Sequence, residues 1–411
     1  MADTAFTRTV MDKVAKYMQL GPVHSQFNEQ SYIFNYFKPK MKPMAGRKWL
    51  VPVRTGGLAG VGNRAEAGTL PDAKTTTYAE PEIAPTYTYK PVLWTGQTKE
   101  FTGGSGNALV SGTVEAMEYA NIALARDCAR QLWGSSTGQI ALANGAGTSS
   151  TTLTLDTPGT LYMTPGMDLD VSSSLTDATI STVDSDTQVT LSSAITWSDN
   201  DPIYVRGNKD IDAYGFQDIF YDGTNSLWGT GSVAETTVYG LTRSTNTWTY
   251  PHITASVGNS ITINFQKAMA KAKQKSGHAT NVIFCSPGVF SSFFYAHKAL
   301  THFLIPTQGD GKTPVLYAGH QKMFVNGVPI YDDPFAWSSD SDGPGVAVFL
   351  NTDYLEIYHT RPPFQGCAPT PTQTLDEEFT RLNYYWSGFS CRNFQAHAAL
   401  TGITEFNVSA T

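Results

Sequence analysis

The residues whose spacing comes closest to a known chemical motif form a glycine-rich stretch, RTGGLAGVGNRAEAGTLP, at positions 54–71. A dinucleotide fingerprint needs G-x-G-x-x-G between a strand and a helix, because the N–H groups at a helix N-terminus bind the phosphate. Gly57, Gly60 and Gly62 run G-x-x-G-x-G instead, and closely spaced prolines disfavour a helix after them. The stretch therefore predicts a loop that bends and reaches.

Two further glycine motifs also fall short of a catalytic signature. GDGKT at 309–313 resembles the end of a P-loop, but Pro306 stands where the first glycine belongs and Pro314 follows where a helix should begin. GGSGN at 103–107 ends in Asn107, so it is not the G-x-S-x-G of a nucleophile elbow. Both motifs are typical of turns.

The titratable residues form no recognisable catalytic or metal-binding set. The eight histidines include no H-E-x-x-H, and the adjacent carboxylates of Asp332/Asp333 and Glu377/Glu378 would point to opposite faces of an extended chain. Two aspartate pairs could offer oxygen ligands to calcium, but neither continues into an EF-hand loop; they are Asp168/Asp170 and Asp184/Asp186. We expect no metal, cofactor or catalytic residue, although a site assembled from distant residues stays an alternative.

Composition indicates a folded, acidic protein. The chain has 411 residues, 41% of them hydrophobic, and its formal net charge is −7 because 35 acidic residues outnumber 28 basic ones. That balance argues against a chain whose main task is to neutralise nucleic-acid phosphates, so any DNA nearby is contained rather than gripped. The four cysteines lack C-x-x-C spacing and indicate reduced thiols in a cytosolic setting, and we expect neither a signal peptide nor a membrane span.

The N-terminal third predicts an arm followed by a hairpin. Residues 3–18 have the periodicity of an amphipathic helix, whereas QSYIFNYFKPKMKPM is too irregular for a helix and predicts an extended arm lying on another surface. KWLVPV and TYTYKPVLWTGQT are strand-like and flank the glycine-rich loop. We therefore expect one long hairpin over residues 49–97, and partners for the arm and the hairpin from other copies of the chain.

A long helix and a β-rich insert come next. Residues 107–133 carry one apolar stripe that includes Leu124, Cys128 and Leu132, with Arg130 outside it, and Gly134 predicts a left-handed cap. Residues 148–206 then change to short β-type runs, namely TLTL, MDLDV, ATISTV, QVTLS and PIYV. The excess of aspartate in this segment favours an inserted domain of about five strands that faces outward and can be removed without unfolding the rest.

The second half alternates helices and strands. We expect helices at 258–276, ended by Gly277, and from Pro287, with a buried strand NVIFC between them and an Asn-Gly hairpin turn in KMFVNGVPIYDD. The remainder predicts β-structure. The fold class is therefore α+β, without an internal repeat.

This order of parts resembles the major capsid protein of tailed double-stranded-DNA bacteriophages, the Hong Kong 97-type shell fold. The 207–252 stretch, with YGFQDIF and GLTRSTNTWTYPH, is similar to the link between insert and axial domain in that family. The resemblance implies these divisions: an N-terminal arm at 1–48, an E-loop hairpin at 49–97, a peripheral domain with the spine helix at 98–147, the inserted β-domain at 148–206, a mainly axial domain at 207–345, and a β-rich return to the peripheral domain at 346–411.

The same resemblance implies a structural role for the opening loop. Glycine allows the low-barrier backbone changes that a subunit needs in both five- and six-fold surroundings. We expect Arg54, Arg64 and Glu66 to contact a neighbouring subunit. Some relatives form a covalent bond through a lysine near this tip, but here Lys74 lies on the flank, which argues against such a bond.

The implied function is a self-assembling shell of pentamers and hexamers, the icosahedral or prolate phage head, around double-stranded DNA. Expected partners are copies of the chain itself, DNA without sequence-specific contact, and scaffold, portal and decoration proteins, without a membrane. The expected location is the virion, assembled in the bacterial host cytoplasm. Two alternatives remain open: an encapsulin-type nanocompartment, and a β-rich carbohydrate-active enzyme favoured by the Ser/Thr-rich insert and the abundant Trp and Tyr.

Overall fold

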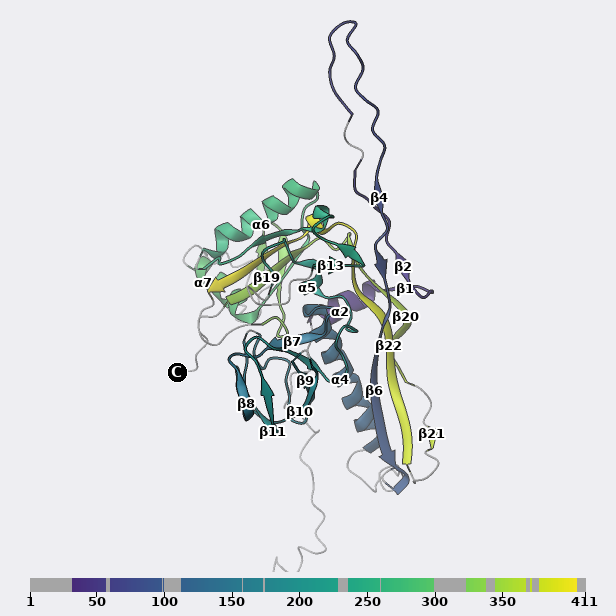
Figure 1. The fold of residues 1–411 in the computed structure, drawn as a ribbon, viewed down its shortest axis with the longest axis vertical. Coiled ribbons are helices and arrows are strands. Elements are labelled where there is room, and N and C mark those ends of the chain that lie inside the picture. Colours follow the sequence, from purple (N-terminus) through teal and green to yellow (C-terminus); the bar gives the residue numbers. More distant parts are fainter. Residues whose placement is uncertain are drawn as a thin grey trace, which may run out of the picture.

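A computed structural model gives the fold of the chain (Figure 1). The expected helix at 3–18 and the GDGKT and GGSGN motifs lie outside the residues that it describes, which are 32–56, 60–97, 99, 112–156, 158–172, 174–227, 236–258, 260–298, 323–337, 344–366, 370–371 and 377–404.

A long helix, α4 (Gly112–Trp133), packs along two long strands, β6 (Thr86–Thr95) and β22 (Glu377–Cys391) (Figure 1). Leu124, Cys128 and Leu132 are buried, which confirms the apolar stripe. Gly134 ends the helix without entering the left-handed region, so the expected cap was wrong: its N–H bonds back to the Arg130 carbonyl at 2.9 Å. The sheet also contains β20 (Leu355–Gly366), β1 (Lys42–Pro43) and β21 (Thr370–Pro371), in the order β1-β20-β22-β21, with β6 beside β22.

A second sheet forms the other large part of the molecule, and two helices cover one of its faces. Helix α6 (Ile261–Ser276) ends at Gly277, whose φ of 79° and N–H bond to the Lys273 carbonyl confirm the expected cap. Helix α7 is Pro287–Lys298, and Asn326 and Gly327 form the expected turn with positive φ. The strand order is β15 (His252–Thr254), β23 (Ala398–Thr404), β19 (Pro344–Leu350), β16 (Val282–Cys285), β18 (Val328–Asp332) and β17 (Met323–Val325).

The two faces of this sheet belong to two cores because side chains alternate along each strand. Ile283 and Phe349 pack under α6 and α7, whereas Val282, Phe284 and Val348 join the core around α4. Strands β19 and β23 therefore lie in this sheet, while β20 and β22 lie in the sheet beside α4. The described residues of 346–404 thus contribute to both sheets, and the division that assigns 346–411 to a peripheral domain stays a prediction.

The strands between residues 139 and 205 form a six-stranded sheet that closes on itself. The five expected strands are present, and a sixth, β7, precedes them; a bridge between Ala143 and Leu155 joins the ends of the two edge strands. The sheet thus begins before residue 148, where the insert was expected to start. The strand order is β7 (Gln139–Leu142), β12 (Pro202–Val205), β9 (Asp168–Val171), β10 (Thr176–Ser185), β11 (Gln188–Trp197) and β8 (Gly147–Thr154).

This small barrel is fastened to the rest of the chain. The buried Tyr162 hydroxyl donates a hydrogen bond of 2.9 Å to the Phe335 carbonyl, which follows β18. Leu169 and Val171 of the barrel belong to the same contiguous apolar cluster as Leu132 of α4. The barrel is therefore packed against the rest of the chain on one side, while its removal without unfolding the rest stays a prediction.

The aromatic part of the arm is also part of this core, contrary to expectation. Tyr32–Phe37 forms a short helix, α2, in which Ile33, Phe34 and Phe37 are buried. The Asp333 carboxylate accepts the N–H of Ile33 at 2.7 Å and so satisfies one donor of the first turn. Tertiary burial stabilises a helix that the local sequence alone does not favour. A 3₁₀ turn, η1 (Lys38–Lys40), follows.

The hairpin is shorter than expected. Its arms pair as β2 (Trp49–Leu50) with β5 (Glu82–Ile83) and as β3 (Val53–Arg54) with β4 (Tyr78–Ala79). Strand β6 pairs with β22 instead of continuing the hairpin. The remaining short elements are α5 (Phe216–Ile219), β13 (Thr237–Val238), β14 (Leu241–Thr242), η2 (Thr247–Thr249) and η3 (Phe394–Ala396).

Candidate inter-subunit surfaces

The hairpin loop projects far beyond the body of the molecule (Figure 1). Among the described residues, the outermost backbone bond between its two arms joins the Thr55 N–H to the Thr77 carbonyl at 2.9 Å, and the described residues past that point are almost all exposed. Gly60 has a φ of +93°, and a Cβ there would lie 2.8 Å from the Asp72 carbonyl oxygen. Only glycine fits this crossing of the two arms without strain.

The three expected contact residues lie on this loop but do not meet. The Nε of Arg54 donates to the Gly56 carbonyl at 3.3 Å, and the Nε of Arg64 donates to the Thr69 carbonyl at 2.7 Å. Glu66 is exposed. Among the described residues none of the three is in an ion pair, so their contact with a neighbouring subunit stays a prediction.

The loop also exposes apolar side chains, which the sequence reading did not single out. Val61 is 93% exposed and Leu70 is 80% exposed. Side chains so fully exposed gain nothing from the fold of their own subunit, since burial is what makes an apolar side chain stabilising. They are available to a partner surface.

A second exposed apolar surface lies on the long sheet, on the face away from α4. Tyr87, Tyr89 and Leu93 alternate outward along β6, and Phe379 of β22 pairs with Leu93 across the strands. We call this set the outer face. An alternating strand with one solvated face is usually polar on that face, so its apolar side chains indicate an interaction surface. The alternation in TYTYKPVL was the available sequence signal.

Buried charges hold the C-terminal end of α4. Arg130, expected outside the apolar stripe, is buried and pairs with Asp127 and Asp212, both at 2.8 Å. These carboxylates hold the pKa of Arg130 above its ordinary value against the opposing effect of burial. Burial raises the pKa of Asp212 to about 6, although the Arg130 cation opposes that rise.

Two further buried carboxylates bind backbone at the same junction. Asp218 accepts hydrogen bonds from the N–H and hydroxyl of Ser136, both at 2.8 Å, and from the Gly215 N–H at 2.9 Å. Burial raises the pKa of Asp218 and of Asp333 to about 6, while their hydrogen bonds act in the opposite direction. These residues fasten α4, α2 and the following segments together and are not open to a substrate.

The aspartate pairs weighed for calcium are used within the barrel. Asp170 is buried and accepts the Gly207 N–H at 2.8 Å, whereas Asp184 accepts the hydroxyls of Thr182 and Thr190. These hydroxyls lower the pKa of Asp184. In the described part of the chain no cluster of three His, Cys, Asp or Glu side chains could hold a metal ion. Its helices include none that is long and apolar enough to cross a membrane.

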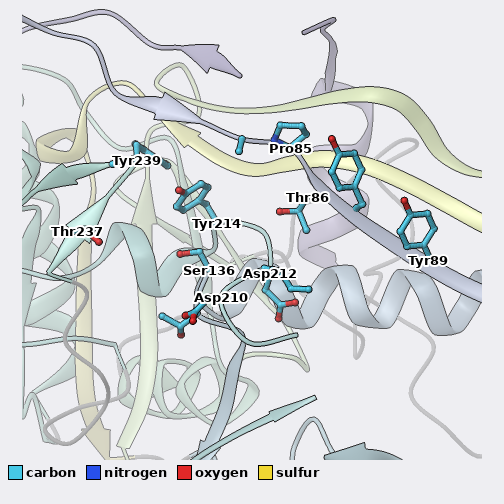
Figure 2. Close-up of a pocket in the computed structure, with 14 residues that line it drawn as sticks. Pro85, Thr86, Tyr89, Ser136, Asp210, Asp212, Tyr214, Thr237 and Tyr239 are labelled. Atoms are coloured by element: carbon cyan, nitrogen blue, oxygen red, sulfur yellow. The ribbon is translucent and has the colours of Figure 1, made fainter. Parts of the chain in front are cut away.

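A groove lies where the outer face meets the segment that follows the barrel. It has a volume of about 650 Å³ and is lined by residues of β6, of 136–137, of 210–214 and of the β13–β14 hairpin. Figure 2 shows Tyr89 on β6 at one end of the groove, Tyr214 and Tyr239 together at the other end, and Asp210, Asp212 and Ser136 below Tyr214.

Comparisons with known proteins identify the fold. No protein-family model and no curated protein sequence matches the chain. A solved structure of the cyanophage A-1(L) capsid asymmetric unit matches with a TM-score of 0.59 and 12% identity, over 97% of this chain and 100% of the other. The capsid of an empty GTA particle matches with a TM-score of 0.54 and 9% identity, over 98% and 99%. The holo-SrpI encapsulin complex from Synechococcus elongatus matches with a TM-score of 0.51 and 7% identity, over 98% of this chain and 97% of the other. The chain therefore has, over nearly its whole length, the fold of these shell-forming proteins.

Proposed function

We propose that the chain is a phage major capsid protein, a structural subunit of which many copies form pentamers and hexamers and close the virion head around double-stranded DNA. The observation that carries the proposal is the projecting loop with its highly exposed apolar residues, on a chain that matches capsid folds over nearly its whole length. Within the described part of the chain the outer loop packs on no other element, and it fits a heterologous contact between copies.

The family parts map onto the elements as follows in this proposal. The 49–83 hairpin is the E-loop, α4 is the spine helix of the peripheral domain, and the sheet covered by α6 and α7 is the axial domain. Arg54, Arg64 and Glu66 contact a neighbour, and the outer face accepts part of the next subunit. Scaffold, portal and decoration proteins would join the shell in the bacterial cytoplasm, without a catalytic step by this chain.

Electron microscopy and sedimentation of the purified chain test the proposal. We expect rings of five or six subunits and closed shells. Helix α2 should resist protease in single subunits because it is buried there, whereas the projecting loop should resist protease only after assembly. The tip has no lysine, so boiled particles should give a single band near 44.6 kDa. A monomer at every concentration and salt tested would refute the shell role, and a covalent ladder would refute the non-covalent contact and make Lys74 the first residue to replace.

The encapsulin match favours a second candidate, a nanocompartment that encloses protein cargo. Both candidates predict closed shells. The contents of particles purified from the natural source separate them: nuclease-protected double-stranded DNA supports the capsid, whereas a co-purifying enzyme without nucleic acid supports the compartment.

A further inference from the structure

The groove beside the outer face combines aromatic rings with one exposed carboxylate. Tyr87, more than half exposed, and Tyr214 line it, and Asp210 lies at its edge. In the described part of the chain Asp210 is in no ion pair, unlike the neighbouring Asp212. Exposed Ile211 adds an apolar side chain to the lining.

This combination matches the chemistry of an arginine side chain. A guanidinium stacks on aromatic rings and donates charge-assisted hydrogen bonds to a carboxylate. The same sheet already shows the stacking within one subunit, since the guanidinium of Arg381 lies 5.7 Å from the centroid of the Tyr89 ring. The volume of the groove is also within the range of pockets that bind small ligands or a few side chains.

The loop presents a complementary segment. Arg64 uses its Nε and Nη1 on the carbonyls of Thr69 and Asn63, which leaves further donors of its five for a partner. Val61 and Leu70 on either side supply apolar surface. The segment cannot reach the groove of its own subunit, because Ala84 and Pro85 at the foot of the same hairpin line that groove while the loop extends away from it (Figure 1).

We propose that this groove is the receiving site for the Arg64 segment of a neighbouring copy, with the guanidinium between the tyrosine rings and the Asp210 carboxylate. The proposal rests on the shell function above and names the partner surface of its loop. A contact from the loop of one copy to the foot of the loop of the next is heterologous, and its repetition closes a ring.

A binding experiment on unassembled subunits tests the contact directly. A fluorescent peptide of residues 60–71 is titrated with the full chain, and its anisotropy gives Kd. Asp210→Arg should weaken binding about tenfold or more, since a hydrogen bond to a charged group is lost and a repulsion replaces it. Asp353→Arg, a matched reversal of another exposed aspartate, should change Kd less than twofold.

A charge swap separates a specific pair from general electrostatics. A peptide with Arg64→Glu should bind the wild-type chain weakly but recover at least half of the lost affinity on the Asp210→Arg chain. Three outcomes would overturn the groove as the receiving site. They are undetectable binding of the wild-type peptide, an equal change of Kd in Asp353→Arg and Asp210→Arg, and no recovery of affinity in the charge swap.

Assembly is scored separately by microscopy. If the binding tests fail but the chain still forms shells, the shell function stands and the groove is rejected. If the peptide binds as expected but the chain never forms a closed particle, the groove stands and the shell function is rejected.

Discussion

Replacing Arg130 with methionine tests the buried charges at the end of α4. The guanidinium lies 2.8 Å from Asp212, and both side chains are almost fully buried. Methionine keeps an unbranched apolar stem but lacks the guanidinium, so the Asp212 carboxylate stays buried without its cation. Loss of one partner of a buried pair costs about 3–5 kcal/mol of unfolding free energy when the remaining group is charged.

The cost should depend on pH in a defined direction. Burial already holds the pKa of Asp212 near 6, above its value of about 3.8 in the unfolded chain, and removing Arg130 raises the folded-state pKa further. A carboxyl group with a raised folded pKa contributes stability that is present at low pH and lost as pH rises through that pKa. The difference from wild type should therefore grow by about 1.4 kcal/mol per pH unit above pH 6, up to the new pKa. At pH 5 about 1–3 kcal/mol should remain for the lost hydrogen bonds.

Urea unfolding of unassembled subunits, followed by tryptophan fluorescence between pH 5 and 8, measures this effect. Arg130→Met with Asp212→Leu should remove the additional loss of stability above pH 6, because no buried carboxylate is left at that position, whereas Asp218 and Asp333 contribute as in wild type. Arg206→Met is the matched surface control: half-exposed Arg206 pairs with exposed Asp177, and its loss should cost less than about 1 kcal/mol at any pH. An equal cost of Arg130→Met at pH 5 and pH 8 would refute the reasoning.

Three further changes probe other joints of the fold. Gly388→Ala should destabilise the subunit by more than about 2 kcal/mol in the same urea assay, because φ is +68° and the new Cβ would lie 2.3 Å from the Tyr214 carbonyl oxygen. Gly145→Ala is the control: φ is +78° but the new Cβ would meet open space, so it should cost only the backbone strain of about 1 kcal/mol. Tyr162→Phe should cost about 1–3 kcal/mol by leaving a buried carbonyl unpaired, and an unchanged midpoint would show that the barrel is not held there. Replacing 148–206 with a Gly-Ser linker should lower the melting temperature of the remaining chain, because β7 loses β12, and an unchanged cooperative melt would restore the view of a separable module.

The sequence was sufficient where a local pattern determines the structure. The apolar stripe of α4, the Gly277 cap and the Asn-Gly turn follow from helix periodicity and from positive φ, which are properties of neighbouring residues. The reaching loop was predictable for the same reason, since its glycines and prolines exclude regular structure.

Elements that depend on distant partners were missed or misplaced. Helix α2 is stabilised by Phe284, Phe389 and Asp333, far along the chain, so its local sequence indicated an extended arm. Strand β7 was missed because a short apolar run has no decisive period and its pairing with β12 is non-local. The candidate site divided in the same way. That Arg54, Arg64 and Glu66 lie on a projecting loop could be predicted, while their contact with a neighbour stays a prediction; the groove that we propose as their receptor forms only when β6 and the 210–214 segment come together.

Helix α2 also determines where a subunit can change shape. The centroid of the Phe37 ring lies 6.3 Å from that of Phe284 in β16 and 5.0 Å from that of Phe389 in β22. Phe37 therefore packs between the sheet covered by α6 and α7 and the sheet beside α4, the two halves of the molecule. Rotation of one half against the other would shear close-packed aromatic rings, and interiors at this packing density resist continuous deformation. If copies assemble into rings of different sizes, as we propose, each would keep this rigid body and adjust at the projecting loop.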